Sequence, residues 1–182
     1  MEPAALPLIR YDDQRLLGGV PTARGLQSLA QLGVTTLVDC RTASELAGEV
    51  ERPQRAAVAL GMRCYWRPLP RGSWSAGTLG ALWLAAFGDP EAKVYLYSQR
   101  GLRPLAALII LDAFSRRWSL VEVAHRAQAR GLSLDGGHPL AQLVRQEVLD
   151  GGSYPAAMVV CERRMDLFGP HHLLHPDRRR SR

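Results

Sequence analysis

The stretch that most constrains the fold is Val94–Pro104, which reads Val-Tyr-Leu-Tyr-Ser-Gln-Arg-Gly-Leu-Arg-Pro. Its first four residues form an apolar and aromatic run typical of a buried strand. The apolar stretch that follows predicts a helix with Pro104 in its first turn, where a missing N–H costs little. A strand, a short glycine-containing loop and a helix N-terminus together favour anion binding, because backbone N–H groups and the helix dipole attract negative charge. Arg103 at the end of the loop adds a bidentate donor suited to a phosphate-like oxyanion.

Strand and helix patterns alternate along most of the chain. Strands are predicted at Leu6–Arg10, Arg15–Gly18, Val34–Asp39, Met62–Arg67 and Val94–Tyr97, and further helices at Ala23–Leu32, Pro53–Gly61, from Ser75 or Thr78 to Phe87, Leu120–Arg130 and Pro139–Leu149. Such alternation requires crossover connections, so we expect an α/β fold with a mainly parallel central sheet and helices on both faces, in three layers. The loop Ser98–Arg103 then lies at the carboxyl end of its strand, where open α/β sheets bind ligands.

The chain of 182 residues suits one α/β domain, which we place at residues 1–152, followed by a C-terminal extension over residues 153–182 that is partly flexible. Within the extension, Ala156–Cys161 reads as either an edge strand or part of the core. The grouping of His171, His172 and His175 with Asp166 and Asp177 fits no standard zinc spacing, so we expect a flexible tail and no metal site.

Charge and cysteine content bear on partners and location. The net charge is +6, and part of it sits in the tail Arg178–Arg182, which offers a weak nucleic-acid contact or a contact with an acidic surface. Three scattered cysteines suggest neither a disulfide framework nor a metal motif, as is usual in a reducing cytoplasm. The N-terminus does not resemble a signal peptide and no apolar stretch is long enough to cross a membrane, so we expect a cytoplasmic protein without membrane contact.

The loop resembles the signature loop of the cysteine-dependent protein tyrosine and dual-specificity phosphatases, most closely the small bacterial branch that reads roughly Tyr/His-Cys-Arg-Ser-Gly-Thr-Arg. Tyr97, Gly101 and Arg103 match that pattern, whereas Ser98 stands where the nucleophilic Cys belongs. The resemblance implies a phosphatase-like fold without a cofactor and phosphate binding by Gln99, Arg100, Gly101, Leu102 and Arg103. Four residues separate Ser98 from Arg103, one fewer than in the main phosphatase family. Rhodanese-like sulfurtransferases also carry a short loop here.

Two further segments can be compared with the same branch, and the first of them matches it. The predicted strand Val34–Asp39 is followed by Arg41 and Glu45, where the branch has Arg and then Glu. We expect these two to form a salt bridge beside the site, with direct substrate contact as the alternative. The resemblance places the loop that supplies an Asp general acid after the strand Met62–Arg67, but no Asp or Glu lies between Arg67 and Gly88. A solvated turn with Trp74 packed on the core fits this segment better.

These residues predict a protein that binds a phosphate-bearing ligand or phosphoprotein at the Ser98–Arg103 loop. The thiolate of the family forms a phosphocysteine, and a serine hydroxyl is a far weaker acid, so we expect impaired catalysis, that is, a pseudophosphatase. One alternative is an active phosphatase captured as a Cys-to-Ser trap at residue 98. Another is a non-enzymatic interaction module or a rhodanese-like protein, for which phosphate binding at the loop is not required.

Overall fold

A computed structural model describes residues 8–46, 51–135 and 137–149 of the chain. The predicted extension 153–182, with the segment Ala156–Cys161, the histidine group and the terminal arginines, lies outside the described residues. The elements in chain order are β1 (Ile9–Arg10), β2 (Arg15–Gly18), α1 (Ala23–Gln31), β3 (Thr36–Asp39), α2 (Ala43–Leu46), α3 (Glu51–Ala59), β4 (Arg63–Trp66), α4 (Ala76–Phe87), β5 (Val94–Tyr97), α5 (Leu102–Arg116), α6 (Leu120–Gln128) and α7 (Pro139–Leu149).

The five strands form one sheet in the order β1-β2-β5-β3-β4. β5 occupies the centre and pairs in parallel with β2 on one side and with β3 on the other, so Gly18, Tyr97 and Asp39 end their strands side by side. Only β1 runs antiparallel, because it forms a hairpin with β2. In that hairpin the Asp12 carboxylate accepts hydrogen bonds from the N–H groups of Gln14 and Arg15. The predicted α/β fold with a mainly parallel sheet is confirmed.

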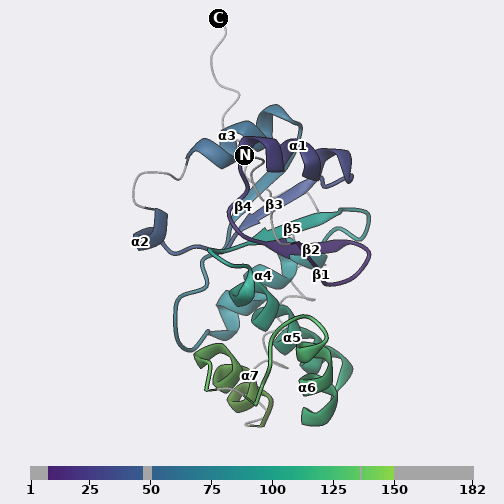
Figure 1. Cartoon of the computed structure of the whole chain (residues 1–182), viewed down its shortest axis with the longest axis vertical. Helices are drawn as coiled ribbons and strands as arrows, with labels where there is room; N and C mark the ends of the chain where they lie inside the picture. Colours follow the sequence, from purple (N-terminus) through teal and green to yellow (C-terminus); the bar gives the residue numbers. More distant parts are fainter. Residues whose placement is uncertain (1–7, 47–50, 136, 150–182) are drawn as a thin grey trace, which may run out of the picture.

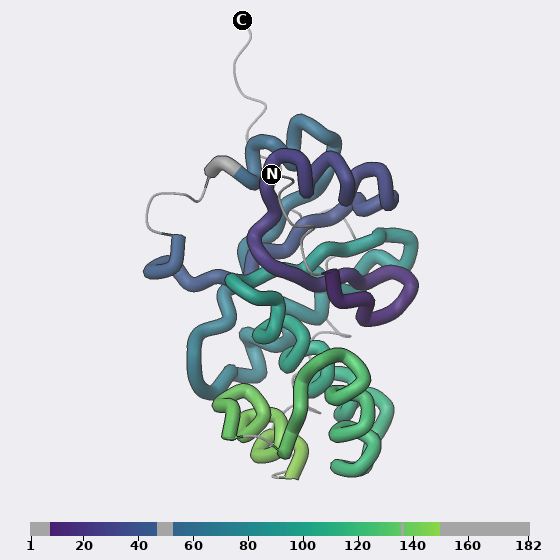
Figure 2. The backbone as a smooth tube through the Cα atoms, viewed as in Figure 1, coloured from purple at the N-terminus to yellow at the C-terminus, as the bar shows by residue number. Residues whose placement is uncertain are grey.

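Helices cover both faces of the sheet, and each face has its own apolar core. α1 and α3 lie on one face, whereas α4 to α7 lie on the other (Figure 1). The smaller core joins α1 and α3 to the side chains of Leu37, Tyr95 and Tyr97, while the larger core surrounds α5. Residues 105–110 of α5 are completely buried, as expected for a helix that is apolar around its circumference. Figure 2 shows that the helices on the α1–α3 face come from the earlier part of the sequence and those on the α4–α7 face from the later part.

The predicted elements match the structure with small shifts at their ends. α3 begins at Glu51 rather than Pro53, and α5 begins at Leu102, so that Pro104 is the third residue of its first turn. The short helix α2 is not among the predicted elements, because four residues are too few to show helical periodicity. Trp74 is buried, as predicted. Across the described part of the chain, no helix combines the length and the apolar character needed to cross a membrane.

Candidate functional site

Gly101 shapes the turn between β5 and α5. It is the N-terminal cap of α5 and has φ of +75°, a backbone conformation that glycine adopts without strain. A Cβ atom at this position would lie 2.9 Å from both the Cα and the carbonyl oxygen of Gly18, at the end of the neighbouring strand β2. The loop therefore packs directly on the backbone of β2, and this contact leaves no room for a side chain at position 101.

Ser98 is the first residue of the loop, and its side chain holds the loop closed. Its N–H donates to the Gly18 carbonyl at 3.3 Å, and its Oγ accepts a hydrogen bond from the Gly101 N–H at 3.1 Å. The residue is 2% exposed. The hydroxyl oxygen thus lies inside the turn, surrounded by backbone groups of the loop.

Most other backbone N–H groups of the loop have no hydrogen-bond partner among the described residues. Within the described part of the chain, the backbone N–H groups of Gln99, Arg100, Leu102 and Arg103 donate to no other group. Two of these groups belong to the first turn of α5, where a helix leaves its N–H groups unpaired. Donors left free beside the positive end of a helix dipole favour an anion over a neutral ligand.

Arg103 reaches across the site to two other segments. Its Nη1 donates to the Leu69 carbonyl at 2.6 Å, and its Nη2 lies 2.9 and 2.7 Å from the two carboxylate oxygens of Glu45. The residue is 8% exposed, and no described residue accepts a hydrogen bond from its Nε. The guanidinium is therefore fixed by two of its nitrogens, and the third remains available to a ligand.

Glu45 is held in place by the start of α2. Its Oε2 accepts hydrogen bonds from the Thr42 N–H at 2.9 Å and from the Thr42 Oγ1 at 3.0 Å, which forms half of a capping box. Burial raises the pKa of Glu45, but the hydrogen bonds from Thr42 and Arg103 outweigh it, so that the pKa lies below its ordinary value. Glu45 is therefore a charged partner of Arg103 at neutral pH.

Arg41 has a different partner from the one expected. Its Nε and Nη2 donate to the Asp39 carboxylate at 3.0 and 2.7 Å, and the Tyr97 hydroxyl donates to the same carboxylate at 2.9 Å. Burial and the Asp39 charge raise the pKa of Tyr97, so its hydroxyl stays protonated and remains a donor. The expected salt bridge between Arg41 and Glu45 is wrong: Arg41 pairs with Asp39 of β3, and Glu45 binds Arg103. The Tyr97 hydroxyl links β5 to the same Asp39 carboxylate.

Comparisons with known proteins identify the fold. No family model matches the chain, and no curated protein matches it in sequence. Among solved structures, a putative phosphatase from Neisseria meningitidis has a TM-score of 0.63 at 19% identity, over 80% of this chain and 99% of that chain. P. aeruginosa TpbA has a TM-score of 0.63 at 14% identity, over 89% and 94%. Tk-PTP has a TM-score of 0.61 at 19% identity, over 82% and 99%. The chain has the fold of the cysteine-dependent phosphatases. This confirms the fold that the sequence resemblance implied.

The sequence resemblance places the acid loop in the segment from Arg67 to Ser75, which follows β4. This segment contains no carboxylate. Leu69 binds Arg103 through its carbonyl, and Trp74 is anchored by a hydrogen bond from its Nε1 to the Pro70 carbonyl at 2.8 Å. The contact of Leu69 with Arg103 was not predicted from the sequence, because a backbone carbonyl looks the same at every position.

Of the two cysteines in the described part of the chain, Cys40 lies beside the end of β5, where Ser98 follows. It follows Asp39, its N–H donates to the Tyr97 carbonyl at 2.8 Å, and it is completely buried. Burial raises the pKa of its thiol, and Asp39 raises it further, although Arg103 and Arg67 act in the opposite direction. Cys40 is therefore a protonated thiol within the core and does not replace the missing nucleophile.

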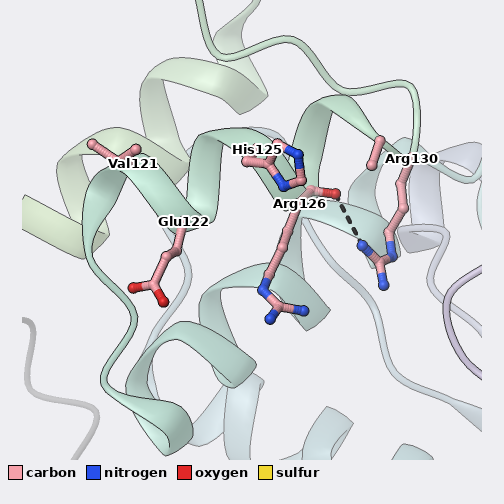
Figure 3. A pocket seen from close by; sticks show the side chains of 6 residues that line it. Val121, Glu122, His125, Arg126 and Arg130 are labelled. Atoms are coloured by element: carbon pink, nitrogen blue, oxygen red, sulfur yellow. Dashed lines mark hydrogen bonds between the residues drawn. The ribbon is translucent and has the colours of Figure 1, made fainter.

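Two hollows lie on the described surface. One, of about 340 Å³, is lined by Thr42, Ser44, Glu45, Pro70 and Arg71 and adjoins Arg103 through Glu45. The other, of about 480 Å³, lies along the outer face of α6 between Val121 and Arg130 (Figure 3). His125 lines this second hollow and is exposed. No group of His, Cys, Asp and Glu among the described residues is arranged to hold a metal ion.

Proposed function

We propose that this chain binds a phosphate-bearing ligand at the loop Ser98–Arg103 and that Ser98 leaves it catalytically impaired. The observation that carries this proposal is that several hydrogen-bond donors around the Ser98–Arg103 loop have no partner in the described structure. The N–H groups of Gln99, Arg100, Leu102 and Arg103 and the Nε of Arg103 lack partners within the described structure. A tetrahedral oxyanion accepts hydrogen bonds on every oxygen, so it suits such a set better than a neutral ligand does.

Solved structures of the same fold support a phosphate-bearing ligand. A variant of TpbA has been solved in complex with phosphotyrosine, and PTPMT1 in complex with PI(5)P. These ligands differ in everything except the phosphate group. For this chain we therefore propose only that it recognises a phosphate group, carried either by a small-molecule ester or by a phosphoprotein.

Impaired catalysis rests on the side chains that are present. Ser98 offers a hydroxyl in place of a thiol, and its Oγ already accepts the Gly101 N–H. Within the described structure, no His, Asp or Glu side chain is hydrogen-bonded to that oxygen as a base. The segment after β4 offers no carboxylic acid to protonate a leaving oxygen. What remains is an anion-binding turn on a phosphatase scaffold.

Calorimetric titration with inorganic phosphate tests the proposal. Arg103→Ala should weaken binding by about 1.5–3 kcal/mol, the range for hydrogen bonds to charged groups. Arg103→Lys should also weaken it, because the planar fork is lost. Arg145→Ala is the matched control, since Arg145 lies on α7 and pairs with Asp135. Equal phosphate affinity in the unmodified protein and in Arg103→Ala would contradict the anion site and favour an interaction module.

A further inference from the structure

The hollow beside Arg103 adjoins the proposed phosphate site directly. Thr42, Ser44 and Glu45 come from the segment after β3, while Pro70 and Arg71 come from the segment after β4. Glu45 belongs to both places, because its carboxylate lines the hollow and contacts the Nη2 of Arg103 at 2.7 Å. Because the Arg103 guanidinium and the hollow share Glu45 as a neighbour, the hollow is within reach of an organic group attached to a phosphate at the loop.

The hydroxyl groups on one wall of the hollow have a fixed hydrogen-bond direction. Thr42 Oγ1 lies 3.0 Å from Glu45 Oε2 and 3.0 Å from Ser44 Oγ. An ionised carboxylate only accepts, so the single hydroxyl hydrogen of Thr42 goes to Glu45. Ser44 must then donate its own hydrogen to Thr42. Ser44 Oγ and the Glu45 carboxylate are left with lone pairs, so this wall accepts hydrogen bonds and donates none.

Arg71 contributes hydrogen-bond donors to the hollow, in contrast to the acceptors of Ser44 and Glu45. Its guanidinium has five N–H donors and no acceptor. The residue is exposed, and no described carboxylate forms an ion pair with it. The hollow therefore presents acceptors from Ser44 and Glu45 and donors from Arg71. A hydroxyl group both donates and accepts, so a group with several hydroxyls satisfies both kinds of partner at once.

We propose that the ligand is the phosphate ester of a polyhydroxylated ring, such as a sugar or a cyclitol. This inference rests on the proposed function, since the phosphate must occupy the loop for the ring to reach the hollow. Ring hydroxyls donate to Ser44 Oγ and to the Glu45 carboxylate, and Arg71 donates to the ring oxygens. An aryl ester such as phosphotyrosine brings a ring without hydroxyl donors, and it would cover the lone pairs of Ser44 and Glu45 without replacing their water.

Calorimetric titration with three probes tests this inference: inorganic phosphate, myo-inositol 1-phosphate and O-phosphotyrosine. We expect the inositol ester to bind about tenfold more tightly than inorganic phosphate, since one or two ordinary hydrogen bonds correspond to roughly that factor. O-phosphotyrosine should not exceed inorganic phosphate. Ser44→Ala and Arg71→Ala should each reduce the preference for the inositol ester about fivefold, the equivalent of one hydrogen bond. Ser115→Ala, at an exposed serine of α5, is the matched control and should keep the preference.

The outcomes separate this inference from the proposed function. If no probe binds, the phosphate site itself is wrong, and the inference falls with it. If inorganic phosphate binds but the inositol ester binds no more tightly, the phosphate site stands and the polyol ligand is wrong. Tighter binding of O-phosphotyrosine would also overturn the polyol ligand. A preference that survives both Ser44→Ala and Arg71→Ala would show that the hollow does not hold the ring.

Discussion

At the scale of the residue, Ser98 is one of three features that we expect to prevent catalysis at the loop, together with the loop's length and the missing carboxylic acid. We expect Ser98→Cys to leave hydrolysis of 4-nitrophenyl phosphate at background, because the loop is one residue shorter than in the main family and no carboxylic acid lies between Arg67 and Gly88. The assay needs a reductant, since residue 98 and Cys40 directly follow the paired residues Tyr97 and Asp39 at the ends of β5 and β3. Ser98→Ala is the control. Turnover by Ser98→Cys that Arg103→Ala abolishes would instead reveal an intact phosphatase whose nucleophile has been replaced.

Glu45 links the site to the dependence of stability on pH. Its pKa in the folded protein is below its ordinary value, so its charge stabilises the fold above the unfolded pKa of about 4.3. That contribution is lost as the pH falls through the lower, folded pKa. Glu45→Gln should therefore reduce the free energy of unfolding at pH 7 and make little difference near pH 3, as measured by urea denaturation. A deficit of equal size at both pH values would contradict an ionised Glu45 in the native state.

At the scale of one element, α5 depends on the turn that precedes it. Gly101→Ala should destabilise the protein by about 1–3 kcal/mol or more, because it combines backbone strain at positive φ with a clash against the backbone of Gly18. Gly131→Ala is the matched control, since Gly131 has φ of +85° and nothing within 4 Å of its missing Cβ. Thermal unfolding of both variants separates strain from clash. Equal losses in the two variants would show that the contact with Gly18 is unimportant.

At the scale of the whole molecule, the described elements form closed cores on both faces of the sheet, and the last of them, α7, packs on α5. We therefore expect a chain ending at Gly152 to fold, with the same Tm and the same phosphate affinity as the full chain. Differential scanning calorimetry and phosphate titration of the two proteins provide the measurement. A large drop in Tm would show that residues 153–182 belong to the domain, and a drop in phosphate affinity alone would place them at the site.

The sequence by itself determined the kind of fold and the position of the loop. Alternating strand and helix patterns are local, so the parallel sheet and its two helical faces were predictable before any contact was known. The loop was predictable for the same reason, since a buried strand, Gly101 and the proline-containing start of α5 are consecutive in the chain. The resemblance to the phosphatases added two expectations, that Arg103 binds phosphate and that Ser98 stands at the nucleophile position.

The tertiary structure alone decided which charges meet. Asp39 and Glu45 are both near Arg41 in sequence, yet Glu45 binds Arg103, 58 residues away, and Arg41 turns to Asp39. A carboxylate pairs with whichever guanidinium the fold brings within hydrogen-bond distance, and sequence spacing does not report that distance. Two backbone contacts were not predictable from the sequence either. The Leu69 carbonyl accepts a hydrogen bond from Arg103, and the backbone of Gly18 packs against Gly101. Backbone groups are chemically alike at nearly every residue, so the sequence does not show which of them make such contacts.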